Sequence, residues 1–160
     1  MMSDEKKPKI RILPNEIILS EVGRLIEEGH PCIIRVKGYS MLPFIVGDRD
    51  SVRLIKATTY HKRDIVLAEI YPGHYVLHRI QAIEGDLPDD HVTLMGDGNL
   101  KNREFCQVKN LIGITDIIFR DGKEINPYSG RERFYTFLWL LCLPIRRWLL
   151  AIFRRLNYFK

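Results

Sequence analysis

The spacing of hydrophobic positions changes twice along the chain and divides it into three parts. In residues 14–28 the apolar residues recur every three or four positions, which predicts an amphipathic helix. Its apolar face is expected to hold Ile17, Ile18, Val22, Leu25 and Ile26. From residue 32 onward, short apolar runs alternate with turn residues, a pattern typical of β-strands in a mainly β fold.

The β region is expected to contain several short strands that pair mostly with their neighbours in an antiparallel sense. We expect strands at residues 32–37, 51–56, 64–70, 75–83, 91–95 and 111–119. Gly113 lies inside the last of these runs and indicates a bend or bulge. Asp121-Gly122 then predicts a tight hairpin turn into residues 123–126.

The third part begins after residues 127–133, PYSGRER, which have the composition of a linker. The apolar run at 134–145 is shorter than the roughly 20 residues that a membrane-spanning helix needs. Beyond it, two arginine pairs alternate with the sequence WLLAIF, and at about 100° per residue they form two opposite arcs of a helix. One arc holds Trp148, Leu149, Ile152, Phe153 and Leu156, and the other holds Arg146, Arg147, Arg154 and Arg155 together with Leu150 and Ala151.

This cationic amphipathic pattern is typical of a helix that lies in a membrane interface. The alternative is a C-terminal helix that packs on the domain or on a second copy of the chain. We therefore expect residues 134–160 to associate peripherally with an anionic membrane surface, with a location on its cytoplasmic side.

The charge of the chain supports this division. Residues 131–160 contain seven basic residues and one acidic residue, which gives +6, while the whole chain carries +5. Residues 1–130 therefore carry −1, from 18 basic and 19 acidic residues. Because the basic character is confined to one segment, a nucleic-acid partner is not expected.

The remaining composition indicates neither a metal site nor a secretory leader. Cys32, Cys106 and Cys142 are widely spaced and match no metal or disulfide pattern, so we expect neither a metal nor a cofactor. The first nine residues are polar and no apolar stretch follows them, so neither a signal peptide nor an N-terminal anchor is expected.

The candidate chemistry is concentrated around a serine in the sequence VKGYSMLPFIVGDRDSV, residues 36–52. Gly38 can adopt a positive φ, and Pro43 fixes its own φ, so Ser40 is expected on a stiff corner between two strands. Taken alone, Gly-x-Ser-Met is most typical of an ordinary turn.

His78 is the candidate base for this serine, because an imidazole near neutrality can accept a proton from a hydroxyl. Strand alternation places it on one face with Val76 and Ile80, and Leu77 and Arg79 on the other. The alternative is a histidine that only packs in the core.

Three segments together resemble the boxes of the serine peptidase superfamily of type I signal peptidases and SOS (LexA-like) repressors. They are GYSMLP with the following Gly47-Asp48, DIVLAEIYPGHYVLHRI at 64–80, and MGDGN at 95–99. A histidine at the position of the usual lysine is similar to the endoplasmic-reticulum and archaeal signal peptidase branch. The resemblance implies a signal-peptidase-like catalytic β domain at 32–126, preceded by a tail and helix at 1–31 and followed by the linker 127–133 and the segment 134–160.

The resemblance also implies roles for individual residues. Ser40 would be the nucleophile, His78 the base and Asp97 the group that orients it. The backbone N–H of Ser40, on the Gly38 turn, would bind the oxyanion. Residues expected only to shape the site are Met41, Pro43, Gly47 and Asp48. A second acidic partner of the histidine is left open, because the chain has Asn102 and Glu104 in the corresponding stretch.

The function implied is that of a serine endopeptidase that cleaves a peptide or protein precursor without a cofactor. A different class of function is also open. The β domain could be a catalytically inactive peptide-binding or regulatory module tethered to a membrane.

Overall fold

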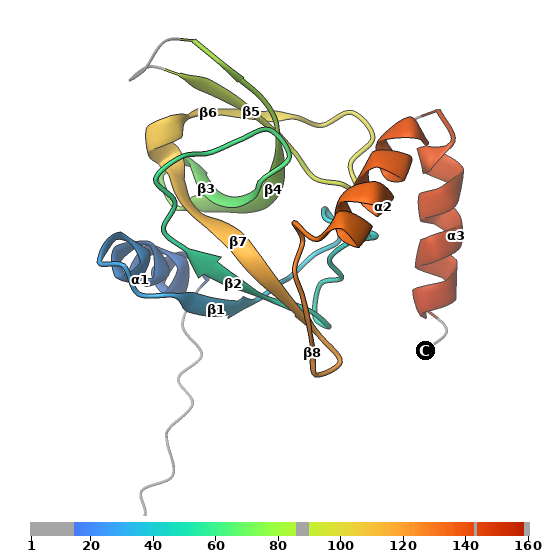
Figure 1. Cartoon of the computed structure of the whole chain (residues 1–160), viewed down its shortest axis with the longest axis horizontal. Helices are drawn as coiled ribbons and strands as arrows, with labels where there is room; N and C mark the ends of the chain where they lie inside the picture. Colours follow the sequence, from blue (N-terminus) through green and yellow to red (C-terminus); the bar gives the residue numbers. More distant parts are fainter. Residues whose placement is uncertain (1–14, 86–89, 143, 159–160) are drawn as a thin grey trace, which may run out of the picture.

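The computed structural model describes residues 15–85, 90–142 and 144–158, and it has the mainly β architecture that the sequence predicts (Figure 1). One antiparallel sheet has the strand order β1-β2-β7-β3-β4-β5-β6, and β8 pairs with β7 as a side branch. The strands are β1 (Cys32–Arg35), β2 (Ser51–Ile55), β3 (Ile65–Tyr71), β4 (His74–Glu84), β5 (His91–Met95), β6 (Glu104–Gln107), β7 (Leu111–Arg120) and β8 (Lys123–Ile125). The helices are α1 (Asn15–Glu27), the short 3-10 helix η1 (Val108–Asn110), α2 (Gly130–Leu141) and α3 (Arg146–Tyr158).

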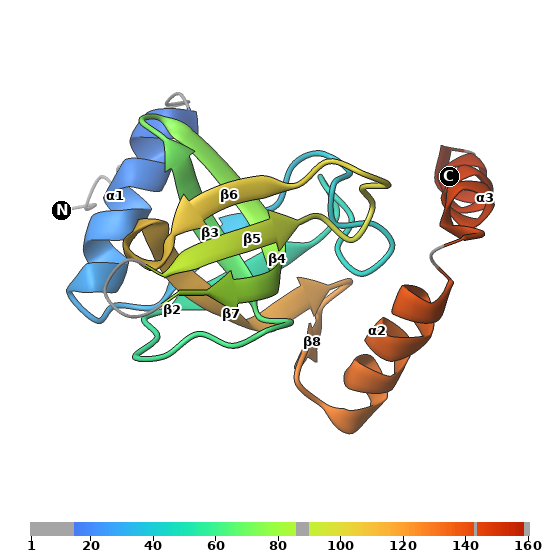
Figure 2. The same cartoon turned by 90° about the horizontal axis from the view of Figure 1, so that it is seen from above.

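The sheet curls back on itself, because β6 at one edge also contacts β3 (Figure 2). Its apolar side chains form two separate clusters. One cluster includes Val66, Ile80 and Leu94, and the other includes Val52, Leu54 and the helix residue Ile26. Both clusters draw on β3, so this strand connects the two halves of the core.

Helix α1 packs on the second cluster beside Gly113 of β7. A Cβ at Gly113 would lie 3.2 Å from Cδ1 of Ile26 and 2.9 Å from the backbone oxygen of Ile55, so a side chain would collide here. The β3–β7 register shifts at this point, between Leu67 and Ala68. The irregularity expected at Gly113 is therefore confirmed.

Most predicted elements are present with ends that differ by a few residues, and two features differ more. The apolar face of α1 includes Val22 and Ile26, but Ile17 and Ile18 are exposed because the cluster begins only with Leu19. Strand β6 was not predicted. Its four-residue sequence EFCQ shows no alternation of apolar and polar positions, and it is held as an edge strand by pairing with β5.

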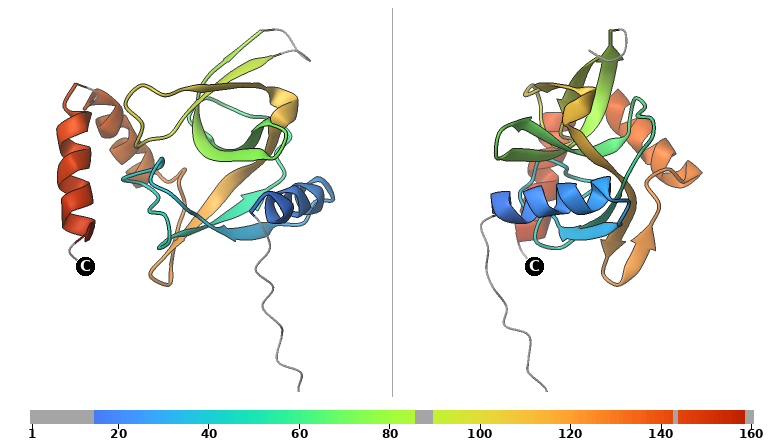
Figure 3. Two further views of the ribbon diagram at one scale, coloured as in Figure 1. Left: turned by 180° about the vertical axis from the view of Figure 1, so that it is seen from behind. Right: turned by 90° about the vertical axis from the view of Figure 1, so that its left-hand side faces the viewer.

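The C-terminal segment forms two helices and not one, and α2 begins inside the predicted linker. The Ser129 hydroxyl accepts a hydrogen bond from the N–H of Glu132, which caps the start of α2. Both helices lie at the end of the molecule opposite α1 (Figure 3). Among the described residues, no helix has the length and apolar composition needed to cross a membrane.

We predict that Ile26→Ala lowers the free energy of unfolding by about 2–5 kcal/mol, because the side chain is fully buried and its removal leaves a cavity. Ile17→Ala, on the same helix but 53% exposed, should cost less than about 1 kcal/mol. Urea denaturation followed by circular dichroism measures both values. Equal losses for the two variants would show that α1 does not pack as described.

Candidate active site

The segment that carries Ser40 joins β1 to β2 and is closed by backbone hydrogen bonds at its two ends. The N–H of Val36 donates to the oxygen of Asp50 over 3.0 Å, and the N–H of Asp48 donates to the oxygen of Val36 over 2.8 Å. Gly38 has a φ of 79°, as its predicted role in the turn requires. A Cβ at Gly47 would lie only 2.1 Å from the oxygen of Gly38, so the close approach of the two backbones requires a glycine at position 47. Asp48, with a φ of 61°, completes this turn.

Asp50 holds the same segment through its side chain, a contact that no pattern in the sequence predicts. Its fully buried carboxylate accepts hydrogen bonds from the N–H of Val46 at 2.9 Å and from the guanidinium groups of Arg49 and Arg120. Burial alone would raise the pKa of Asp50, but these donors outweigh it and lower the pKa. Arg120 also donates to the backbone oxygen of Phe44, which ties β7 to the serine segment.

Ser40 itself is half-buried, with Met41 and Leu42 buried directly after it. Its backbone oxygen accepts a 2.7 Å hydrogen bond from the N–H of Gly98, so the segment at 96–99 lies against the serine turn. A Cβ at Gly96 would approach the same oxygen to 2.3 Å, which explains the glycine at this position. The N–H of Ser40 donates to no group among the described residues.

His78 is buried, and its ring contacts a carboxylate from the other side of β5. Its Nδ1 lies 2.5 Å from Oε2 of Glu104 on β6. The sheet register explains this contact, because Glu104 is opposite Leu94, and Leu94 is opposite Ile80, two residues from His78 on the same face of β4. Glu104 is thus the group that fixes the imidazole, and the unpredicted strand β6 supplies it.

The expectation that Asp97 orients His78 is wrong. Both carboxylate oxygens of Asp97 bond to Arg79, with Nε to Oδ1 at 2.8 Å and Nη2 to Oδ2 at 2.8 Å, and both side chains are buried. The physical reason is strand alternation, since Arg79 follows His78 directly and points to the opposite face of β4. Burial opposes the charge of Arg79, but Asp97 outweighs it and raises the pKa of the guanidinium.

The register also relates His78 to Ser40. Arg79 is opposite Met95, the last pair of β4 with β5, and Gly96 follows directly, where an added Cβ would collide with the oxygen of Ser40. The segment 96–99 therefore contacts both the serine turn, through Gly98, and the strand that carries His78, through the bond of Asp97 to Arg79. Within the described residues, the Ser40 hydroxyl makes no hydrogen bond with His78.

The C-terminal helices pack on the site, which corrects part of the membrane-facing assignment. Arg146 is buried, donates from Nη1 to the oxygen of Asn99 at 3.3 Å, and lies over the ring of Trp139. Burial lowers the pKa of its guanidinium. Trp139 in turn donates its indole N–H to the oxygen of Asp97 at 2.9 Å. Arg146 therefore faces the domain and not a membrane.

The apolar side chains of α3 divide between the domain and its exposed surface. Leu150 packs with Leu42 and Val46, and Phe153 contacts the same cluster. Trp148 and Ile152 are exposed, as expected, and so are Arg147, Arg154 and Arg155, while Leu149 is half-buried. Leu150 faces the domain although the sequence places it on the same arc of the helix as the arginines. Its packing against the domain, and not its position among polar residues, decides that it is buried.

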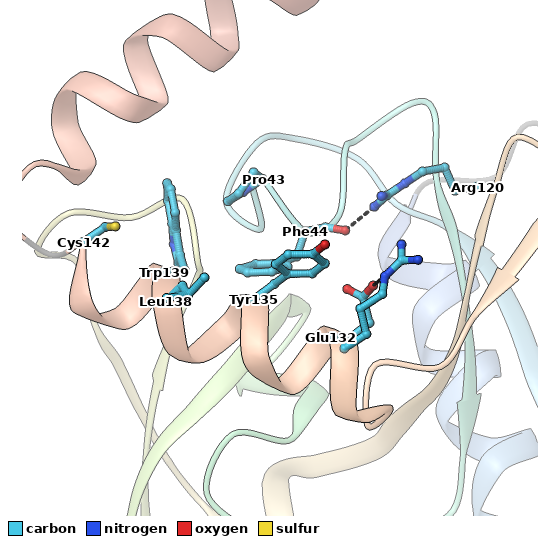
Figure 4. Close-up of a pocket in the computed structure, with 9 residues that line it drawn as sticks. Pro43, Phe44, Arg120, Glu132, Tyr135, Leu138, Trp139 and Cys142 are labelled. Atoms are coloured by element: carbon cyan, nitrogen blue, oxygen red, sulfur yellow. Dashed lines mark hydrogen bonds and ion pairs between the residues drawn. The ribbon is translucent and has the colours of Figure 1, made fainter.

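A cavity of about 350 Å³ lies between the serine segment and α2 (Figure 4). Pro43 and Phe44 from the serine segment face Tyr135, Leu138 and Trp139 from the helix. Arg120, Arg131, Glu132 and Cys142 complete its lining. Pro43, expected only to shape the turn, thus also lines a cavity that begins three residues from Ser40.

Comparisons with known proteins leave the relationship to any family open. A scan of the chain against protein-family models finds no match, and a search of curated protein sequences finds none. No group of three or more His, Cys, Asp or Glu side chains in the described part of the chain could hold a metal ion.

We predict that Asp97→Asn lowers the free energy of unfolding by about 3–5 kcal/mol, because the change leaves the buried Arg79 without its counter-ion. The matched control is Asp116→Asn, which removes the partner of the more exposed Arg53 and should cost about 1 kcal/mol or less. Chemical denaturation at neutral pH measures both. A loss for Asp97→Asn no larger than that of the control would contradict the structural role assigned to this carboxylate.

Proposed function

We propose that the protein is a serine endopeptidase in which Ser40 is the nucleophile, His78 the general base and Glu104 the residue that positions the base. The observation that carries this proposal is the contact between the buried His78 and Glu104, on a strand whose next residue, Arg79, bonds to the 96–99 segment that contacts Ser40. The resemblance of the three sequence boxes to the signal-peptidase and SOS-repressor superfamily supports the same assignment.

The proposed roles of His78 and Ser40 follow from which of their polar atoms already have a hydrogen-bond partner and which do not. With Nδ1–H donated to Glu104, the Nε2 of His78 carries the lone pair and can remove the proton of the Ser40 hydroxyl. Ser40 Oγ then attacks the scissile carbonyl, and the unengaged N–H of Ser40 stabilises the developing oxyanion. His78 returns the proton to the leaving amine, and water repeats the sequence to release the acyl group. This scheme requires the Ser40–His78 hydrogen bond to form as substrate binds, since such bonds are often loose in free enzymes.

We propose a precursor polypeptide as substrate, bound in an extended conformation along a sheet edge. β1 is an edge strand of the sheet, and the chain runs from it directly into the serine turn. Its side chains Ile33 and Arg35 are exposed, so another strand can add beside it.

The alternative is a peptide-binding or regulatory module without catalysis. One observation favours it, namely that the Ser40 hydroxyl is not bonded to His78 in this structure. A fluorophosphonate probe distinguishes the two functions, because it reacts with an activated serine hydroxyl and not with an ordinary one.

We predict that the wild-type chain is labelled by a fluorophosphonate, that Ser40→Ala abolishes labelling, and that His78→Ala lowers its rate by at least about 10³-fold. Mass spectrometry of the labelled chain identifies the modified residue. Ser20→Ala and His61→Ala, on exposed positions, should leave labelling unchanged and serve as matched controls. Unlabelled wild-type protein with intact folding would favour the binding module.

We predict that Glu104→Gln lowers kcat or the labelling rate by at least about 10²-fold, because the amide no longer holds the imidazole in the required tautomer. Its KM and its free energy of unfolding should change little, since Glu104 is partly exposed. The control is Glu124→Gln on β8, and the measurement is labelling kinetics together with urea denaturation. If Glu104→Gln reacted like the wild type, another group would have to orient His78.

A further inference from the structure

The two C-terminal helices expose one row of large apolar side chains each. On α2 the row is Phe134, Phe137 and Leu141, which are 57%, 46% and 61% exposed. On α3 it is Trp148, Ile152 and Leu156, which are 71%, 57% and 68% exposed. Spacings of three and four residues place each row on one side of its helix. We call these six side chains the outer apolar face.

The outer apolar face cannot turn inward without breaking contacts that the domain already makes. The opposite side of α3 holds Leu150 and Arg146, which are 3% exposed and packed on the serine segment and the 96–99 segment. Helix α3 is also the outermost element at its end of the molecule (Figures 1 and 3). The apolar row is therefore a fixed surface feature of the folded chain.

Positive charge accompanies this face and is not balanced within the helix. Arg147, Arg154 and Arg155 are exposed, and α3 contains no acidic residue. Residues 131–160 together carry +6, as counted from seven basic residues and one acidic residue. A second copy of the chain placed on this face would bring arginine rows together, whereas an anionic lipid surface would neutralise them.

We propose that the outer apolar face docks into the interface of an anionic membrane, with α3 lying along the membrane surface. Trp148, Ile152 and Leu156 would enter the boundary between headgroups and acyl chains, and Arg147, Arg154 and Arg155 would contact lipid phosphates. Because the inner side of the same helices bonds to the oxygens of Asp97 and Asn99, docking would also hold the Ser40 site at a fixed position relative to the membrane.

The experiment measures partition of the full chain into vesicles of phosphatidylglycerol and phosphatidylcholine by co-sedimentation. Binding should be strong at low salt, should fall as salt shortens the screening length from about 10 Å at 0.1 M to about 3 Å at 1 M, and should be weak on phosphatidylcholine alone. Quenching of Trp148 by brominated acyl chains would show that the outer face enters the lipid, since Trp139 is only partly exposed.

Charge position is tested with two variants of equal net charge. Arg147→Gln, Arg154→Gln and Arg155→Gln combined should weaken binding roughly 100-fold, since each basic residue near an anionic surface contributes about fivefold. Lys62→Gln, Lys109→Gln and Lys123→Gln combined remove three exposed charges elsewhere and should leave binding nearly unchanged.

The apolar contribution is tested in the same way. Trp148→Gln, Ile152→Gln and Leu156→Gln combined should abolish the binding that remains at high salt. The control combines Ile33→Gln, Tyr71→Gln and Phe105→Gln, which remove exposed apolar side chains on the sheet. Ser40→Ala should bind vesicles like the wild type, so failure of the peptidase proposal and failure of this one are distinguishable.

Two vesicle-binding results and one result on oligomeric state would overturn the proposal. Either the wild type does not bind anionic vesicles, or the two charge variants lose binding equally. Light scattering after gel filtration addresses the other occupant. A stable dimer that dissociates on Trp148→Gln, Ile152→Gln and Leu156→Gln would show that a second copy covers this face instead.

Discussion

The buried ion pair between Arg79 and Asp97 is the interaction on which the rest of the site depends. It joins β4 to the 96–99 segment, and each neighbour of that segment then takes its position from it. The N–H of Gly98 holds the oxygen of Ser40, and the oxygen of Asp97 accepts the indole N–H of Trp139. Arg79 also donates to the oxygen of Arg63 at 2.9 Å, which secures the turn before β3. Loss of this one pair would therefore release the serine turn and α2 together.

The pair also shows how one strand can serve structure and chemistry at adjacent positions. His78 and Arg79 point to opposite faces of β4, and each finds a carboxylate on its own face. Arg79 is fully buried with Asp97, where an unpaired charge would be very unfavourable. Glu104 is partly exposed, so the ring of His78 is fixed by a group close to solvent.

Much of the fold could be predicted because a strand with one buried face has apolar and polar residues in alternation, and this pattern is visible in the sequence. The turn at Gly38, the irregularity at Gly113 and the β-strand that carries His78 were all visible in the sequence. The role of Glu104 as the partner of His78 was left open, because β6 is a short edge strand in which two polar residues flank two apolar ones without alternation. Its position depends on pairing with β5, and no local signal in EFCQ indicates which residue will face the histidine. Asp97 was the expected partner because the resemblance to the histidine branch implied it, and no local pattern indicated its bond to Arg79, 18 residues away in the sequence.

The sequence of the C-terminal segment was divided into one apolar and one cationic face, and this division is too simple for α3. A helix that packs on a domain and also faces outward needs three surfaces, and α3 has them. Arg146 and Leu150 belong to the inner one, Trp148 and Ile152 to the outer one, and Arg147 and Arg154 to the side. A helical wheel drawn from the sequence places the inner surface and the side surface in one polar arc, because it cannot distinguish a buried arginine from an exposed one. Arg146 bonds to the oxygen of Asn99 in the 96–99 segment. Helices α2 and α3 therefore connect the serine segment to the surface of the molecule. Any partner that binds the outer apolar face would thus act on elements in direct contact with the Ser40 turn.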